Sequence, residues 1–176
     1  MNTKGDVWVS TVLYTLIGLA IMGSMLAILQ PKISEMRDKF VFEQTVQSMS
    51  ALDDTITNVR EATGMRLNYI IRLDKGNLVI DGANEKISWQ AQSRYQFSEQ
   101  DKQINITGGK IQAFTISSGG LWDTTLTMNY AASKIDIKIN GANEARTLTP
   151  ATNPYSIWIT NKGISGGLQV IDISIE

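Results

Sequence analysis

An uncharged, mostly apolar stretch from Val7 to Gln30 is the feature that most constrains this chain. It contains no Asp, Glu, Lys or Arg, and Pro31 follows it directly. As a helix that rises 1.5 Å per residue, the stretch would extend roughly 36 Å, more than the hydrocarbon thickness of a bilayer. Trp8 and Tyr14 lie near its N-terminal end, where amphipathic rings favour a membrane interface. The sequence therefore predicts a membrane-spanning helix over these residues.

The flanks of this stretch do not match an ordinary secretory signal, whose apolar region is shorter and is followed by a small-residue cleavage site. Here the only cleavage-like pair, Lys4-Gly5, precedes the apolar residues. Lys32, Arg37 and Lys39 follow it, and the positive-inside rule taken alone would place that side in the cytoplasm. Long folded domains can still translocate despite such charges. The charges therefore count against an outward-facing C-terminal region without excluding it.

Small residues recur within the stretch, and some of them share a helical face. Such residues let helix backbones approach closely in lipid or in a dry helix bundle. The expected packing positions are Gly18, Ala20, Gly23, Ser24 and Ala27. Gly is also frequent in membrane helices generally, and the stretch has no Gly-x-x-x-Gly motif. Helix packing and plain membrane composition both explain the pattern.

Beyond Pro31 the pattern becomes amphipathic, with charged residues between apolar ones at helical spacing. The apolar positions are Ile33, Met36 and Phe40, and then, after a small shift in phase, Phe42, Val46, Met49, Leu52, Ile56 and Val59. Pro31 lacks a backbone donor and clashes with the preceding turn, so a kink or local interruption is expected there. We expect one helix from Val7 to Thr63, hinged near Pro31 and stopped by Gly64. Residues 32–63 would present one face to a folded domain.

Residues 64–176 form a region of short alternating apolar segments separated by turn signals such as Asp81-Gly82, Gly119-Gly120 and Gly166-Gly167. The expected strands contain residues 67–71, 78–80, 87–91, 95–97, 104–106, 114–116, 126–130, 135–139, 157–159 and 168–175. Trp89, Trp122 and Trp158 are expected to pack in the core or between sheets. The predicted fold class is α+β: a long N-terminal hydrophobic helix followed by an antiparallel β-sandwich or barrel-like head.

The composition narrows the function classes. The 176 residues include no Cys and no His, which removes disulfides, the usual zinc ligands and every catalytic triad that needs an imidazole. Net charge is −1, so there is no broad electrostatic case for nucleic acid. An enzyme is the weakest interpretation, although a Ser/Lys pair or paired carboxylates stay open. We expect no enzyme activity, no cofactor and no metal.

The chain resembles the type IV pilins, on the motif Lys4-Gly5-Asp6-Val7 placed against the apolar helix and on the helix-then-β-head layout. It is closer to the archaeal pilin and archaellin superfamily, with its class III signal peptide, than to the bacterial branch. The resemblance implies that a leader peptidase cuts between Gly5 and Asp6 on the cytoplasmic side. Residues 1–5 would be the leader, 6–63 the helix and 64–176 the head.

Two departures separate the chain from bacterial pilins. Those proteins usually begin the mature chain with Phe and carry Glu at its fifth position, where this chain would have Asp6 and Ser10. No Cys pair closes a C-terminal loop. The new terminal ammonium left by cleavage needs a partner in a dry environment, and the Asp6 carboxylate is one candidate. A residue merely tolerated by the peptidase explains Asp6 at least as well.

By this resemblance the protein is a structural subunit that self-associates into a cell-surface filament, with residues 7–30 in the filament core. It would reside in the cell membrane before assembly and outside the cell afterwards. The alternative is a single-pass, membrane-anchored adhesion module, or a minor component of a pilus or archaellum machine, that contacts a surface-layer or envelope partner. Adhesion, motility and secretion all stay open as the task of such a filament.

Three shorter motifs each have a functional and a plain structural interpretation. Asn105-Ile106-Thr107 is an N-glycosylation sequon, a short pattern that also arises by chance. The echo between Asp81–Glu85 and Asn140–Glu144 suggests clustered calcium ligands, but both segments have too few ligands and hairpin turns fit them better. Asp53-Asp54 is expected on a solvated helix face rather than as a working carboxylate pair, because adjacent helix residues point different ways.

Overall fold

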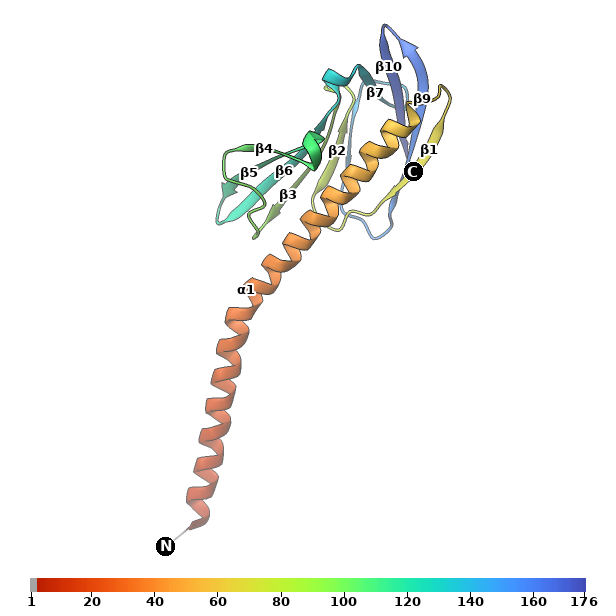
Figure 1. Ribbon diagram of the computed structural model, residues 1–176. Coiled ribbons are helices and arrows are strands. Elements are labelled where there is room, and N and C mark those ends of the chain that lie inside the picture. The colour runs from red at the N-terminus through yellow and green to blue at the C-terminus, as the bar shows by residue number, and fades with distance from the viewer. Residues whose placement is uncertain (1–2) are drawn as a thin grey trace. The chain divides into compact units, whose positions relative to one another are not determined.

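The computed structural model describes residues 3–176, with side chains from Trp8 onward. Within that range, helix α1 (Thr3–Val59) is followed by ten strands in two sheets and by two short 3-10 turns, η1 (Thr107–Gly109) and η2 (Ala131–Ser133), as Figure 1 shows. The α+β class is confirmed. The sheets are not closed into a barrel, so the barrel-like alternative is wrong.

Sheet one has four strands in the order β1-β9-β10-β7. Their bounds are β1 (Arg66–Ile71), β7 (Ile135–Ile139), β9 (Tyr155–Ser165) and β10 (Leu168–Ile175). The β1/β9 and β9/β10 pairs are antiparallel, whereas β7 pairs with β10 in parallel. The antiparallel expectation is confirmed for every other pair, and β7 is the exception because the chain reaches that edge from the other sheet and not through a hairpin.

Sheet two has six strands in the order β4-β5-β6-β3-β2-β8, all antiparallel. Their bounds are β2 (Asn77–Asp81), β3 (Lys86–Ser93), β4 (Gln103–Ile106), β5 (Ile111–Ser118), β6 (Leu121–Asn129) and β8 (Ala145–Leu148). Alternation of apolar and polar residues turns one face of the sheet toward the core. Gly119-Gly120 joins β5 to β6 and Gly166-Gly167 joins β9 to β10, as the turn signals predicted.

The chain divides into two compact units, residues 1–37 and 38–176. The second unit, called the head here, therefore includes the last part of α1 together with both sheets. Phe42, Met49, Leu52, Ile56 and Val59 of that part have no solvent exposure, and Val46 is half-buried. This confirms the predicted core-facing positions beyond Phe40.

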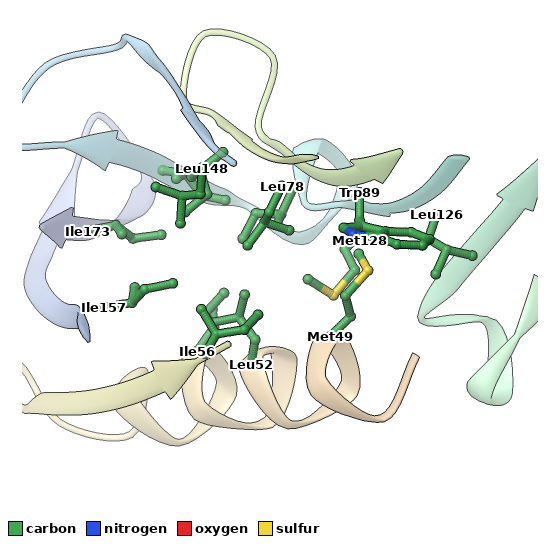
Figure 2. Packing of buried hydrophobic residues seen from close by; sticks show 14 of the residues in the cluster. Met49, Leu52, Ile56, Leu78, Trp89, Leu126, Met128, Leu148, Ile157 and Ile173 are labelled. Carbon is green, nitrogen blue, oxygen red and sulfur yellow. The ribbon is translucent and has the colours of Figure 1, made fainter. Parts of the chain in front are cut away.

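The core of the head lies between this helical face and the inner faces of both sheets. In Figure 2, Met49, Leu52 and Ile56 point from the helix toward Leu78, Trp89 and Met128 of sheet two and toward Ile157 and Ile173 of sheet one. The Phe42 ring meets the Trp89 ring edge-on with centroids 4.9 Å apart and stacks on Phe97 at 5.3 Å. The helix is thus a third layer of the fold.

The end of α1 differs from the prediction. The helix ends at Val59, and residues 60–64 form turns instead of the expected helical turn to Thr63. The buried Asn161 amide of β9 donates to the carbonyls of Val59 (3.1 Å) and Ala62 (3.0 Å), while Gly64 N donates to Asn161 O at 2.8 Å. Free helix-terminal carbonyls need such partners. A distant strand therefore ends the helix one turn early.

Other local predictions need correction. Residues 95–97 lie in a loop, although Phe97 still packs on the core, and β8 has no clear signal in the sequence. Asp81-Gly82 lies in the β2–β3 hairpin as expected, but Asn140-Gly141 turns the chain from β7 in one sheet to β8 in the other. Trp89 is fully buried, whereas Trp158 is half-buried on the outer face of sheet one, 4.2 Å below the Arg66 guanidinium.

Candidate functional site

The apolar part of α1 is the strongest candidate site in the described chain. From Trp8 to Gln30 every residue is exposed except the half-buried Gly18. Trp8, Tyr14 and Ile28 each keep about 70% or more of their side-chain surface accessible, at 71%, 73% and 70%. Soluble proteins rarely expose an apolar surface of this extent. Such a surface marks a site that binds a membrane or another protein.

Two hydroxyl side chains of this segment bond to the backbone of the helix itself. Thr15 Oγ1 donates to the carbonyls of Val12 (2.8 Å) and Thr11 (3.0 Å), and Ser24 Oγ donates to Ala20 O at 2.8 Å. Such bonds allow hydroxyl side chains to enter an apolar medium, where unpaired polar groups cost several kcal/mol. The helix is long and apolar enough to cross a membrane, and its most apolar window has no buried residue.

The small residues predicted for helix packing lie in open space. A Cβ built on Gly18 or Gly23 would meet no atom within 4 Å outside the helix's own nearby backbone. Ala20, Ser24 and Ala27 are exposed at helical spacing beside them. Whether these positions pack against other helices stays a prediction.

The apolar surface continues past Pro31. The helix runs through Pro31 without a break in its helical assignment, so a local interruption is not seen and a bend there stays a prediction. Ile33, Met36 and Phe40 are exposed at 55%, 71% and 66%, although the amphipathic pattern suggested a packed face. The exposed apolar surface of α1 therefore continues as far as Phe40.

The proposed processing motif lies at the beginning of α1. The backbone of Lys4, Gly5, Asp6 and Val7 belongs to the helix, which therefore begins before Val7, at Thr3. The side chains of these four residues lie outside the described part, so cleavage and the Asp6 pairing stay predictions. Asn105 of the sequon is exposed on β4, which is accessible for modification.

A polar cluster inside the head was missed by the sequence analysis. Asp53 is nearly buried: it accepts from Tyr130 Oη at 2.9 Å and pairs with Lys110 Nζ at 3.1 Å, while Lys110 also binds Asp54 at 2.8 Å. The prediction of a solvated face is therefore right for Asp54 and wrong for Asp53. Asp53, Lys110 and Tyr130 line a polar cavity of about 280 Å³, which Arg60 also lines.

The electrostatics of this cluster indicate a structural contact and not a reactive site. Burial, and then the Asp53 charge, raises the pKa of Tyr130 far above its ordinary value, so its phenol stays protonated. Hydrogen bonds to Asp54 and Asp53 raise the pKa of Lys110, which holds its ammonium charge. No group of three or more His, Cys, Asp and Glu that suits a metal ion occurs among residues the structure describes. The cluster joins α1 to β5 and β6.

Two further contacts, both made by Asp38 at the start of the head, hold α1 against the rest of the head. Asp38 accepts from Arg94 N at 2.7 Å and pairs with Lys75, which joins the β1–β2 turn and the end of β3 to the helix.

In comparisons with known proteins, no family model, no curated protein and no solved structure matches this chain.

Proposed function

We propose that this protein is a type IV pilin-like structural subunit, processed after Gly5 and assembled through its N-terminal helix into a cell-surface filament. The observation that carries the proposal is the exposed apolar segment from Trp8 to Gln30, continuous in sequence with a head that buries its own core. The segment lacks charged residues, so it suits lipid before assembly and a bundle of identical helices afterwards.

The driving force in this proposal is burial of apolar surface, worth ~25 cal/mol per Å² removed from water. In lipid, helices gain little from hydrophobicity alone, and close backbone approach then favours association. The open space at Gly18 and Gly23 permits such approach. Pro31 would give the helix freedom to adapt as it leaves the membrane, and Asp6 would neutralise the new terminus of its own or a neighbouring subunit.

The second candidate function is a monomeric, membrane-anchored binding module. It is favoured by the head, which has a complete core in a single chain and needs no neighbouring copy to cover it. In that case the apolar helix would stay in lipid, and an envelope or surface-layer partner would bind the head. Enzyme activity remains outside both proposals.

The experiment that separates the two functions is mass spectrometry of the N-terminus of the chain purified from native membranes. A mature chain that begins at Asp6 supports the pilin-like proposal, and a Gly5→Val variant should then stay uncut and unassembled. Electron microscopy of sheared surface material should show filaments that contain the chain. An intact Lys4-Gly5 in the wild type, with no filaments, would refute the filament subunit and favour the anchored module.

The role of Asp6 can be tested separately. In an Asp6→Gln variant that is still cleaved, the proposal predicts loss of filaments while membrane insertion continues. Normal filament assembly by this variant would rule out charge pairing by Asp6 and leave the rest of the proposal standing.

A further inference from the structure

The outer face of sheet two presents two neighbouring rows of side chains across its strands. Strand register and the inward position of residues such as Leu126 and Trp89 define these rows. The first row is Gln103, Phe114, Thr125, Gln90 and Asn77. The second row is Asn105, Gln112, Thr127, Ser88, Val79 and Thr147. At ~4.8 Å between strands, the first row extends roughly 19 Å. We call this surface the neutral face.

The neutral face carries no Asp, Glu, Lys or Arg in either row. The outer face of sheet one is different: one row there contains Arg66, Thr160, Asp172 and Lys138. Asp172 also pairs with Lys162 at 3.7 Å. The lack of charge is confined to these two rows, because Asp123 and Lys86 lie on the same outer face in the rows on either side, opposite Gln92 and Asn129.

The side chains of the neutral face are exposed or half-buried. Amides and hydroxyls dominate, and each can both donate and accept a hydrogen bond. Gln103 and Gln112 already bond to each other across β4 and β5, which holds their amides in place. Phe114 stands among them with its ring 41% exposed, beside Ile116 at 38%.

We propose that the neutral face binds an uncharged glycan of a surface that the protein contacts. Sugar hydroxyls donate and accept, as the amides of Gln90 and Gln103 do, and the apolar face of a sugar ring suits the exposed Phe114 ring. Within the two rows a charged ligand finds no opposite charge, and the nearest charges on this face, Asp123 and Lys86, lie in the rows outside them. A second copy of the chain fits less well, because the centres of stable protein interfaces are apolar and this one is mostly amide and hydroxyl.

This inference concerns the head alone and rests on neither function proposed above, since a filament subunit and an anchored module would expose the same face. The sequon residue Asn105 lies at its margin, on edge strand β4. A glycan attached there would compete for the face, which gives the experiment a second arm.

The test is binding of the full chain to an array of neutral and carboxylated oligosaccharides, in a detergent without a sugar headgroup. Binding to neutral glycans is expected, with little change at high salt. Thr125→Glu places a charge at the centre of the face and Phe114→Ala removes the ring, so each should weaken binding at least tenfold. The matched control Thr160→Glu, central on the outer face of sheet one, should bind as the wild type does.

Several outcomes would overturn the proposal. One is no binding to any neutral glycan on the array, and another is equal binding by Thr125→Glu and the wild type while both remain folded by circular dichroism. Self-association in sedimentation that Thr125→Glu alone abolishes would assign the face to a second copy. Binding seen only after Asn105→Gln would assign it to the chain's own glycan. None of these results touches the N-terminal cleavage experiment.

Discussion

Asn161 occupies a buried position on β9 where the chain has an irregular register against β10, next to Gly163. Its carboxamide oxygen accepts from Gly163 N at 2.8 Å, and its nitrogen donates to carbonyls at the end of α1. Gly163 has φ +90, and an added Cβ would lie 3.2 Å from the Thr63 side chain. Asn161 therefore supplies the hydrogen bonds between β9 and the end of α1, and Gly163 allows the close approach of the two segments.

Replacement of Asn161 by Ala should destabilise the head by about 1–3 kcal/mol, because buried carbonyls and one backbone N–H lose their partners. The measurement is denaturant unfolding of the full chain in micelles, followed by tryptophan fluorescence. Asn68→Ala is the matched control, since Asn68 is exposed and bonds only to Ser156 Oγ in sheet one. A loss for Asn161→Ala no larger than that of the control would contradict this account.

Two tyrosines make head stability depend on alkaline pH. Burial raises the pKa of Tyr69 and of Tyr130. Above about pH 10 the unfolded chain loses phenol protons that the folded chain keeps, so the free energy of unfolding falls as pH rises. The raised pKa of Lys110 acts in the same direction. Unfolding at pH 8 and pH 10.5 measures the effect, and a Tyr69→Phe/Tyr130→Phe double variant should show a smaller decrease. An equal decrease in that variant would count against it.

At the scale of elements, α1 has two different surfaces along one continuous helix. Beyond residue 41 its apolar positions join the core, and before it they stay exposed. Periodicity predicted the helix and the inward positions from Phe42 to Val59. It misassigned Ile33, Met36 and Phe40, because spacing alone does not say whether a protein layer lies opposite. The parallel β7/β10 pair and strand β8 were likewise unpredictable, since each depends on a partner distant in sequence.

Leu52→Ala tests the helix as a layer of the head. Leu52 is fully buried in the core, so truncation should lower the free energy of unfolding by about 2–5 kcal/mol. The matched control is Leu19→Ala, at a position 66% exposed, which should leave head unfolding unchanged. Both values come from the denaturant midpoint of the full chain. Equal effects of the two substitutions would show that α1 does not contribute to the head core.

At the scale of the whole molecule, the chain combines a head that has its own buried core with a helical segment whose large apolar side chains, from Trp8 to Leu29, are exposed. Exposed apolar surface of this extent favours contact with lipid or with further protein. Within the head, the polar contacts Asp38–Lys75 and Lys110–Asp53 hold the last part of α1 against the β-strand region. The proposed assembly therefore places all new contacts of the helix outside the single chain.

A Gly18→Leu/Gly23→Leu double variant tests that placement. Both side chains enter open space in the single chain, so head unfolding and membrane insertion should not change. If helices pack closely in a filament, filament yield in sheared material should fall at least tenfold by electron microscopy. The control is Met22→Leu, which exchanges two side chains of similar size at an exposed position of the same segment. Normal filaments from the double variant would show that these glycines reflect membrane composition only.

Local sequence patterns were enough to determine the long helix, its uncharged segment, most strands and the α+β class, because periodicity and turn chemistry act over a few residues. Tertiary structure alone decided the helix end at Asn161, the burial of Asp53, the pairing of β7 with β10 and the two rows of the neutral face. Each of these depends on groups brought together from distant parts of the chain. The uncharged stretch from Val7 to Gln30 is read from sequence alone, and the structure adds that its described side chains, from Trp8 onward, are exposed apart from the half-buried Gly18.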